Sequence, residues 1–118
     1  MIRTEHANIH VAKRWDFNSL LNEAVLFINH GGQNSMMDGL LHGVPQLVVP
    51  GKVFERKYNA AALEKAGAGR ALDYTEFKAQ RIKELSEEII SSKEITENAK
   101  NIGSMLHRKD EEFLARFR

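Results

Sequence analysis

Two short apolar runs, separated by a polar and glycine-rich segment, form the clearest pattern in the chain. They are Val25 to Ile28 and Leu47 to Val49. Continuous apolar runs are typical of buried parallel strands, and a helix between two such strands allows them to lie parallel. Between the runs, apolar residues recur at the spacing of one helical face, namely Met36, Met37, Leu40 and Leu41. Because Gly43 and Pro45 then end the helix, Val25 to Pro50 is predicted to be a strand–helix–strand unit.

One strand and one helix are predicted ahead of this unit. Residues 1–7 carry no pattern, whereas Asn8 to Ala12 alternates apolar and polar positions, which indicates a short strand. Asn18 or Ser19 is a suitable N-cap for a helix that continues to Ala24.

The pattern after Pro50 alternates between helix and strand. Ala60 to Lys65 favours a helix that nearby glycines end, and Arg70 to Leu72 is typical of a short final strand. From Glu76, apolar residues at three- and four-residue steps among charges indicate an amphipathic helix, and another is expected from near Thr96. Strands that alternate with helices predict an α/β fold, with flanking helices on a parallel sheet of about four strands and ligands at the strands' carboxyl ends.

The junction after the Val25 to Ile28 strand has the residue types of an anion site. His30, two glycines and small polar residues lead into the helix. At a helix N-terminus, free backbone N–H groups and the helix dipole favour negative charge, so we expect a phosphate there. Asn34 or Ser35 is the predicted N-cap, and a cap and a phosphate ligand use the same geometry. Taken alone, His30 is better explained as a histidine that ends a strand and bonds local backbone, but the Gly-Gly-x-Asn-Ser that follows favours the phosphate site instead.

Composition and charge narrow the function classes. The chain has 118 residues, 42% hydrophobic and 28% charged, which fits one soluble domain. Its 17 basic and 16 acidic residues are interspersed and give a net charge of +1, so nucleic-acid binding is not expected. There is no cysteine, and the five histidines lack metal-ligand spacing. Neither a membrane span nor a signal-peptide core is present, so a cytoplasmic location is expected.

One ordered series of residues carries a resemblance to a known family. It is His30-Gly31-Gly32-Gln33-Asn34-Ser35-Met36-Met37-Asp38-Gly39-Leu40, then Gly43-Val44-Pro45, then Asn59-Ala60 to Gly69. This series resembles the C-terminal, nucleotide-sugar-binding domain of two-domain GT-B glycosyltransferases, the group of macrolide and plant UDP-glycosyltransferases. The similarity runs from about Ile9 to Leu72. It implies a Rossmann-like sheet and an inverting, metal-independent transfer of a sugar from a nucleotide diphosphate.

The resemblance implies which residues hold the donor's phosphates and ribose. The diphosphate positions correspond to His30, Gly31, Gly32, Asn34 and Ser35. A helix N-terminus with neutral or cationic donors then stabilises the leaving diphosphate, and no metal or cofactor is implied.

The ribose and base contacts match the family less closely. An acidic residue eight positions after the histidine binds the ribose in the family, usually as glutamate. Here it is Asp38, which is expected on the first turn of the helix. Trp15 matches the tryptophan that stacks on uracil, but no Pro-Gln follows it. The choice between a UDP-linked and a dTDP-linked donor therefore stays open, and Trp15 is equally explained as a core residue.

The predicted sugar contacts also differ from the family pattern. By the resemblance, Glu55 and Arg56 precede Asn59 at the positions that hold the sugar. The family's glutamine has become Arg56, which can pair with a sugar carboxylate or with a phosphate. The plain alternative is a charged first turn of a helix.

The resemblance also implies parts that this sequence does not contain. With a family strand order of 3-2-1-4-5-6, residues 1–118 supply strands 3 to 6, as one donor-binding domain fragment without the acceptor-binding N-terminal domain and its general base. We expect the open sheet edge to be filled by rearrangement, a second copy in a homo-oligomer, or a separate partner chain. The tail from Arg108 to Arg118 keeps Phe113, Leu114 and Phe117 on one face and is expected to need a further surface.

Three functions follow from these expectations. The first is the donor-binding part of a glycosyltransferase, inactive by itself because the general base is elsewhere. The second is a non-catalytic nucleotide-sugar-binding or interaction module that acts with a partner chain. A Rossmann-like binder of another phosphate ligand is disfavoured, because no Gly-x-Gly-x-x-Gly occurs.

Overall fold

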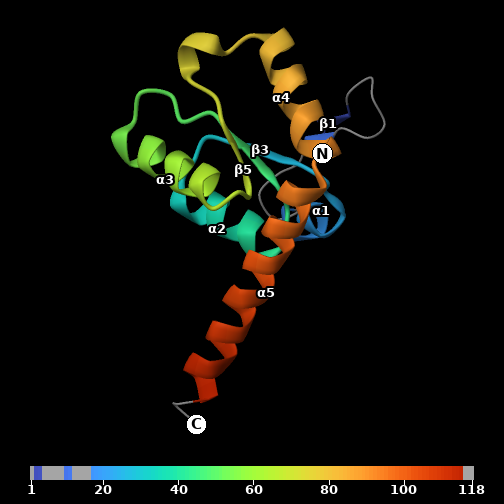
Figure 1. Cartoon of the computed structure of the whole chain (residues 1–118), viewed down its shortest axis with the longest axis vertical. Coiled ribbons are helices and arrows are strands. Elements are labelled where there is room, and N and C mark those ends of the chain that lie inside the picture. Colours follow the sequence, from blue (N-terminus) through green and yellow to red (C-terminus); the bar gives the residue numbers. More distant parts are fainter. Residues whose placement is uncertain (1, 4–9, 12–16, 116–118) are drawn as a thin grey trace.

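A computed structural model describes residues 2–3, 10–11 and 17–115 of the chain (Figure 1). Its elements are β1 (Ile2–Arg3), β2 (His10–Val11), α1 (Phe17–Glu23), β3 (Phe27–Asn29), α2 (Gln33–Leu41), β4 (Gln46–Val48), α3 (Phe54–Lys65), β5 (Gly69–Ala71), the 3-10 helix η2 (Tyr74–Glu76), α4 (Ala79–Ser91) and α5 (Lys93–Ala115). The predicted α/β class is confirmed.

The central sheet is parallel and has the order β3-β4-β5. Phe27 lies opposite Gln46, and Gln46 lies opposite Gly69, so the three strands end at one edge. The sheet has three strands in the described part of the chain, where about four were expected. The strand predicted at Asn8 to Ala12 is β2, which instead pairs antiparallel with β1 in the segment predicted to lack structure. Antiparallel pairing can join segments close in sequence without the crossover that a parallel pair requires.

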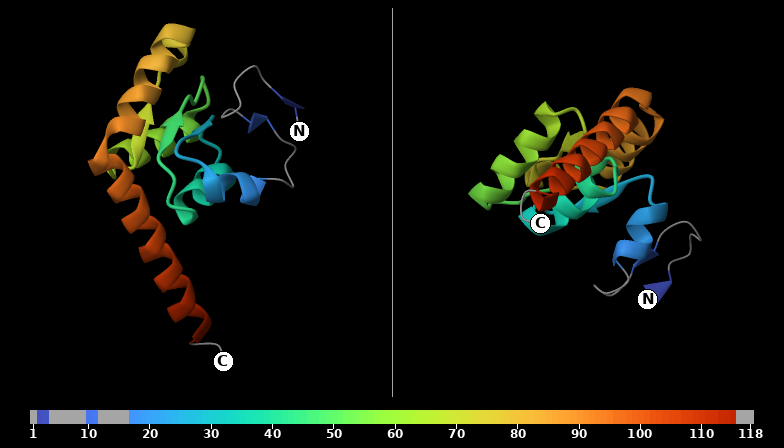
Figure 2. Two further views of the ribbon diagram at one scale, coloured as in Figure 1. Left: turned by 90° about the vertical axis from the view of Figure 1, so that its right-hand side faces the viewer. Right: turned by 90° about the horizontal axis from the view of Figure 1, so that it is seen from below.

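Helices cover both faces of the sheet because neighbouring side chains of β4 point to opposite sides. Leu47 packs with Leu85 and Ile89 of α4 in one core cluster. Val48 packs with Ala60 and Leu63 of α3 in the other, joined by residues of α2. In the left view of Figure 2, α4 and α5 follow one another along one side of the molecule, and α5 continues beyond the other elements.

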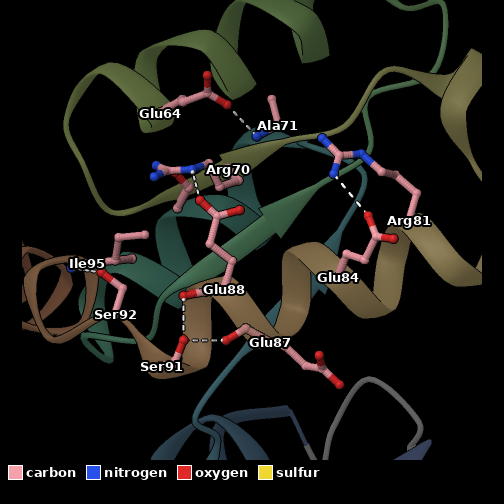
Figure 3. Close-up of polar contacts among 11 residues, drawn as sticks. Glu64, Arg70, Ala71, Arg81, Glu84, Glu87, Glu88, Ser91, Ser92 and Ile95 are labelled. Atoms are coloured by element: carbon pink, nitrogen blue, oxygen red, sulfur yellow. Dashed lines mark hydrogen bonds and ion pairs between the residues drawn. The ribbon is translucent and has the colours of Figure 1, made fainter.

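Polar contacts fix the outer strand β5 to the helices on both sides (Figure 3). The N–H of Ala71 donates to Glu64 of α3 at 2.6 Å. Arg70 forms an ion pair with Glu88 of α4 at 3.4 Å. These carboxylates therefore tie one edge of the sheet to its covering helices.

Helix ends differ most from the sequence predictions. The N-cap of α2 is Gly32, with no side-chain cap, so the prediction of Asn34 or Ser35 is wrong. The helix can begin earlier because Gly31, at φ 85°, turns the chain immediately after β3. Met37 is 40% exposed, although it was predicted to share the buried face with Met36.

The two C-terminal helices also begin away from the predicted positions. Asp73 caps the short helix η2, which occupies the predicted start at Glu76. The helix α4 therefore begins at Ala79. α5 begins at Lys93, not near Thr96, and runs without a break to Ala115.

The long helix α5 projects from the body and gives the molecule extents of 50 × 30 × 28 Å (Figure 1). His107 of this helix donates to the carbonyl of Leu41 at 2.8 Å, and the ring of His42 donates to the carbonyl of Asp38 at 2.7 Å. Both histidines therefore have a structural role and bond carbonyls near the end of α2. The expectation for the apolar tail residues falls outside the described side chains. Among the described residues, no helix combines the length and apolar character needed to cross a membrane.

Candidate functional site

The candidate site is the turn between β3 and α2, at the carboxyl edge of the sheet. Gly31 is buried in this turn at φ 85°. A Cβ on Gly31 would lie 3.0 Å from both Val48 Cγ1 and the Arg56 carbonyl oxygen. The turn is therefore pressed between β4 and the first turn of α3, where a side chain does not fit.

Hydrogen bonds hold the backbone of Gly31 and Gly32 in the turn. The N–H of Gly31 donates to Asn29 Oδ1 at 2.9 Å, and Asn59 Nδ2 donates to the Gly31 carbonyl at 2.9 Å. The N–H of Gly32 donates to His30 Nδ1 at 3.2 Å. The amides of both glycines are thus already engaged within the protein, and their role is to shape the turn.

The donors available to an anion come from the first turn of α2. Its first intrahelical bond runs from Met36 N–H to the Gly32 carbonyl at 3.0 Å. The N–H groups of Gln33, Asn34 and Ser35 precede this ladder and have no intrahelical acceptor. Because His30 Nδ1 accepts a hydrogen bond, its neutral ring carries the proton on Nε2, and the exposed ring can donate from there.

Arg56 and Glu55 lie on the first turn of α3 beside this junction. The Cβ of Arg56 is 3.4 Å from the position that a Cβ on Gly31 would occupy. Neither side chain forms an ion pair or hydrogen bond with any residue that the structure describes. Arg56 is thus a half-buried residue whose side chain starts next to the glycine turn and has no carboxylate partner in the described part of the chain.

The structure brings together most of the predicted donor-site residues. Asn59 contacts the turn itself, and Asn34 and Ser35 lie in the first turn of α2. Asp38 is in the second turn, one turn later than predicted, because the helix begins at Gln33. Trp15 lies outside the described residues.

Charges farther along the same edge of the sheet come from the segment after β5. Hydrogen bonds from the backbone and side chain of Thr75 lower the pKa of Asp73, with a smaller contribution from Lys57. Lys52 lies over the Tyr74 ring, 5.2 Å from its centroid. Among the described residues, no three His, Cys, Asp or Glu side chains are grouped as a metal site would require.

Sequence reasoning missed Gln46, which is linked to the turn through the side chain of Asn29. Its side chain is fully buried. Its Oε1 accepts from Asn29 Nδ2 at 2.8 Å, and its Nε2 donates to the Met36 carbonyl at 2.9 Å. The only signal in the sequence is a polar residue placed immediately before the second apolar run.

The fold and the junction define an α/β domain of the class that binds ligands at the carboxyl ends of parallel strands. The chain belongs to the family described as "Erythromycin biosynthesis protein CIII-like, C-terminal domain", whose model matches residues 2–109. This confirms the resemblance to the C-terminal domain of the GT-B glycosyltransferases.

Individual relatives agree with this assignment. The chain is 36% identical over 89 residues to an uncharacterized UDP-glucosyltransferase, YojK, of Bacillus subtilis, covering 74% of this chain and 21% of that protein. It is 35% identical over 86 residues to the aclacinomycin-T 2-deoxy-L-fucose transferase of Streptomyces galilaeus, covering 72% and 20%. The chain thus spans about a fifth of these curated relatives. The structure of spinosyn forosaminyltransferase SpnP shares the fold, with a TM-score of 0.79 and 24% identity over 92% of this chain and 29% of that one.

Proposed function

We propose that residues 1–118 form a single donor-binding domain fragment of an inverting, metal-independent glycosyltransferase. The ligand is a nucleotide-diphosphate sugar, linked to UDP or dTDP. The observation that carries this proposal is the glycine turn at the carboxyl edge of the sheet, which leads directly into the N-terminus of α2. Relatives named as transferases of glucose and of a deoxyfucose support a sugar donor.

Each residue then has a separate task. The N–H groups of the first turn of α2 and His30 Nε2–H bind the diphosphate and stabilise the charge that develops when it leaves. Asp38 binds the ribose hydroxyls, and Trp15 stacks on the base. Glu55 and Arg56 contact the sugar. Asn59 holds the glycine turn in place, because its side-chain amide already donates to the Gly31 carbonyl.

The general base and the acceptor pocket belong, in this proposal, to an additional domain or chain. By itself the chain is then expected to bind donor without transferring sugar.

A second candidate function is a non-catalytic nucleotide-sugar-binding or interaction module that acts with a partner chain. The observation that favours it is β3, which pairs only with β4 among the described strands. Ile28 within β3 is 49% exposed, and Val25, two residues before the strand, is 67% exposed. An exposed strand edge with apolar side chains is a surface for pairing with another chain.

Calorimetry on the whole 118-residue chain tests the donor proposal. Titrations with UDP, dTDP, UDP-glucose and UDP-glucuronate should show binding of at least one nucleotide diphosphate. His30→Ala should weaken the binding of all of them, because each shares the diphosphate. If none binds at millimolar concentration, the donor-binding function is overturned. Sugar transfer by the isolated chain would contradict the assignment of the general base to another part.

A further inference from the structure

Gln46 is the only polar side chain that is fully buried among the residues that the structure describes. It begins β4, the middle strand, opposite Phe27, and its side chain reaches Asn29 at the end of β3. Both ends of its amide are used, so its burial carries no unsatisfied group. An apolar side chain of similar volume would fill the same space without requiring any partner. The amide therefore calls for an explanation beyond packing.

The contacts of Gln46 lead to the turn through one intermediate residue. Gln46 Oε1 accepts from Asn29 Nδ2 at 2.8 Å, and Asn29 Oδ1 accepts from the Gly31 N–H at 2.9 Å. On its other side, Gln46 Nε2 donates to the Met36 carbonyl in α2 at 2.9 Å. A continuous relay thus joins the first turn of α2, β4, β3 and the glycine turn.

The chemistry of the relay allows only one orientation of each amide. The Met36 carbonyl can only accept, so Gln46 must present Nε2 to it and Oε1 to Asn29. Asn29 must then present Nδ2 to Gln46, which leaves Oδ1 for the Gly31 N–H. The backbone of α2 therefore determines, through two side chains, which atom meets the turn.

α2 is shaped to accommodate Gln46. A Cβ on Gly39 would lie 2.5 Å from Gln46 Nε2 and 2.9 Å from the Phe27 ring. The glycine inside the helix therefore provides the space in which the glutamine amide lies.

We propose that Gln46 is a positioning residue for donor binding, which fixes the Gly31 amide through Asn29 and so sets the geometry between the turn and the N-terminus of α2. This inference rests on the proposed donor function. It assigns to that site a buried residue that does not itself touch the ligand.

The test replaces Gln46 with methionine, which has similar length but no amide. The dissociation constants of UDP and dTDP should rise about tenfold, as for one lost positioning hydrogen bond. In the free protein, the Gly31 amide should exchange with solvent about tenfold faster in NMR measurements. The matched control is Leu47→Met on the same strand, which faces the other core cluster and should leave binding and exchange unchanged.

A double-mutant cycle separates the relay from general destabilisation. Asn29→Leu removes the acceptor for the Gly31 N–H, and in that background Gln46→Met should weaken UDP binding no further. An equal loss in both backgrounds would overturn the relay.

A second variant keeps the inference testable if Gln46→Met does not fold. In Gln46→Glu, a protonated carboxyl can donate to the Met36 carbonyl and accept from Asn29, whereas the ionised form cannot donate. Relative to the wild type at each pH, its UDP affinity should fall as pH rises. A ratio that does not change with pH would contradict the proposal.

The outcomes for the two proposals differ. If the wild type binds neither UDP nor dTDP, the donor function itself fails. If the wild type binds and Gln46→Met matches the Leu47→Met control, only the positioning role fails.

Discussion

At the scale of single residues, the backbone geometry of the site depends on Gly31. Its left-handed conformation, at φ 85°, strains any L side chain. The space around it is also closed, because Val48 Cγ1 and the Arg56 carbonyl both lie 3.0 Å from the position of a Cβ. Conformation and close packing therefore act together at this position.

Gly31→Ala is expected to lower the free energy of unfolding by roughly 2–4 kcal/mol, from backbone strain and steric overlap together. The control is Gly51→Ala, because Gly51 has φ 64° with no atom within 4 Å of a Cβ. In that variant the free energy of unfolding should fall by only about 1–2 kcal/mol, which is the cost of the backbone conformation without steric overlap. Urea unfolding of both variants measures the difference, and equal losses would show that the packing around Gly31 is not limiting.

Arg56 can contact either the sugar or the phosphates of the donor, because its guanidinium has no ion-pair partner among the described residues. If it contacts the sugar, Arg56→Gln should weaken UDP-glucuronate binding about tenfold and leave UDP nearly unchanged. Calorimetry with both ligands measures this, with Lys57→Gln on the exposed side of α3 as the control. An equal loss for both ligands would assign Arg56 to the phosphates instead.

Asp73 provides a pH-dependent contact near the same edge. Hydrogen bonds from the Thr75 N–H and hydroxyl hold the pKa of Asp73 below its ordinary value of 3.8. Because the folded-state pKa is lowered, this contribution to stability is present above pH 3.8 and is lost as pH falls through the folded-state pKa. In NMR titrations, Thr75→Ala should raise the pKa of Asp73 part of the way, whereas Thr75→Ser should not. An unchanged pKa in Thr75→Ala would assign the effect to the backbone bond alone.

At the scale of elements, the strand–helix–strand unit was predictable because each of its parts is specified locally. The two apolar runs place β3 and β4 within one or two residues, and Gly43 and Pro45 mark the end of α2. The start of α2 was not predictable, because the turn before its N-cap Gly32 is held by Asn59, 28 residues from Gly31. The role of Gln46 depends likewise on partners 10 and 17 residues away. The candidate anion site could therefore be predicted from the sequence, whereas the hydrogen bonds through which Asn59 and Gln46 hold its turn could not.

Gly39 tests how closely α2 approaches the sheet. Inside a helix, alanine is normally more stable than glycine by about 1 kcal/mol. Here a Cβ would overlap the Gln46 amide and the Phe27 ring, so Gly39→Ala should instead lower the free energy of unfolding by roughly 1–3 kcal/mol. Thermal and urea unfolding measure the sign of the change. A higher melting temperature in Gly39→Ala would mean that the helix can move away from the sheet at little cost.

At the scale of the whole molecule, the two edges of the parallel sheet differ. The β5 edge is tied to the helices through Glu64 and Arg70. On the other side, β3 has a strand neighbour only at β4 in the described part of the chain. Ile28 within β3 and Val25 just before it are exposed. The proposed diphosphate site therefore follows the less protected strand of the sheet.

This asymmetry predicts self-association through β3 when no other partner is present. Unpaired strand edges with apolar side chains join other chains, and lysine at such an edge opposes pairing by charge repulsion and desolvation. Sedimentation velocity should show concentration-dependent dimers of the wild type and mainly monomers of the Val25→Lys, Ile28→Lys variant. Phe77→Lys is the control, because Phe77 is 60% exposed and follows η2, outside the β3 strand. A wild type that stays monomeric at all concentrations would contradict self-association. Dimers that persist in the double variant would place the contact elsewhere, with the projecting end of α5 as the next surface to test (Figure 1).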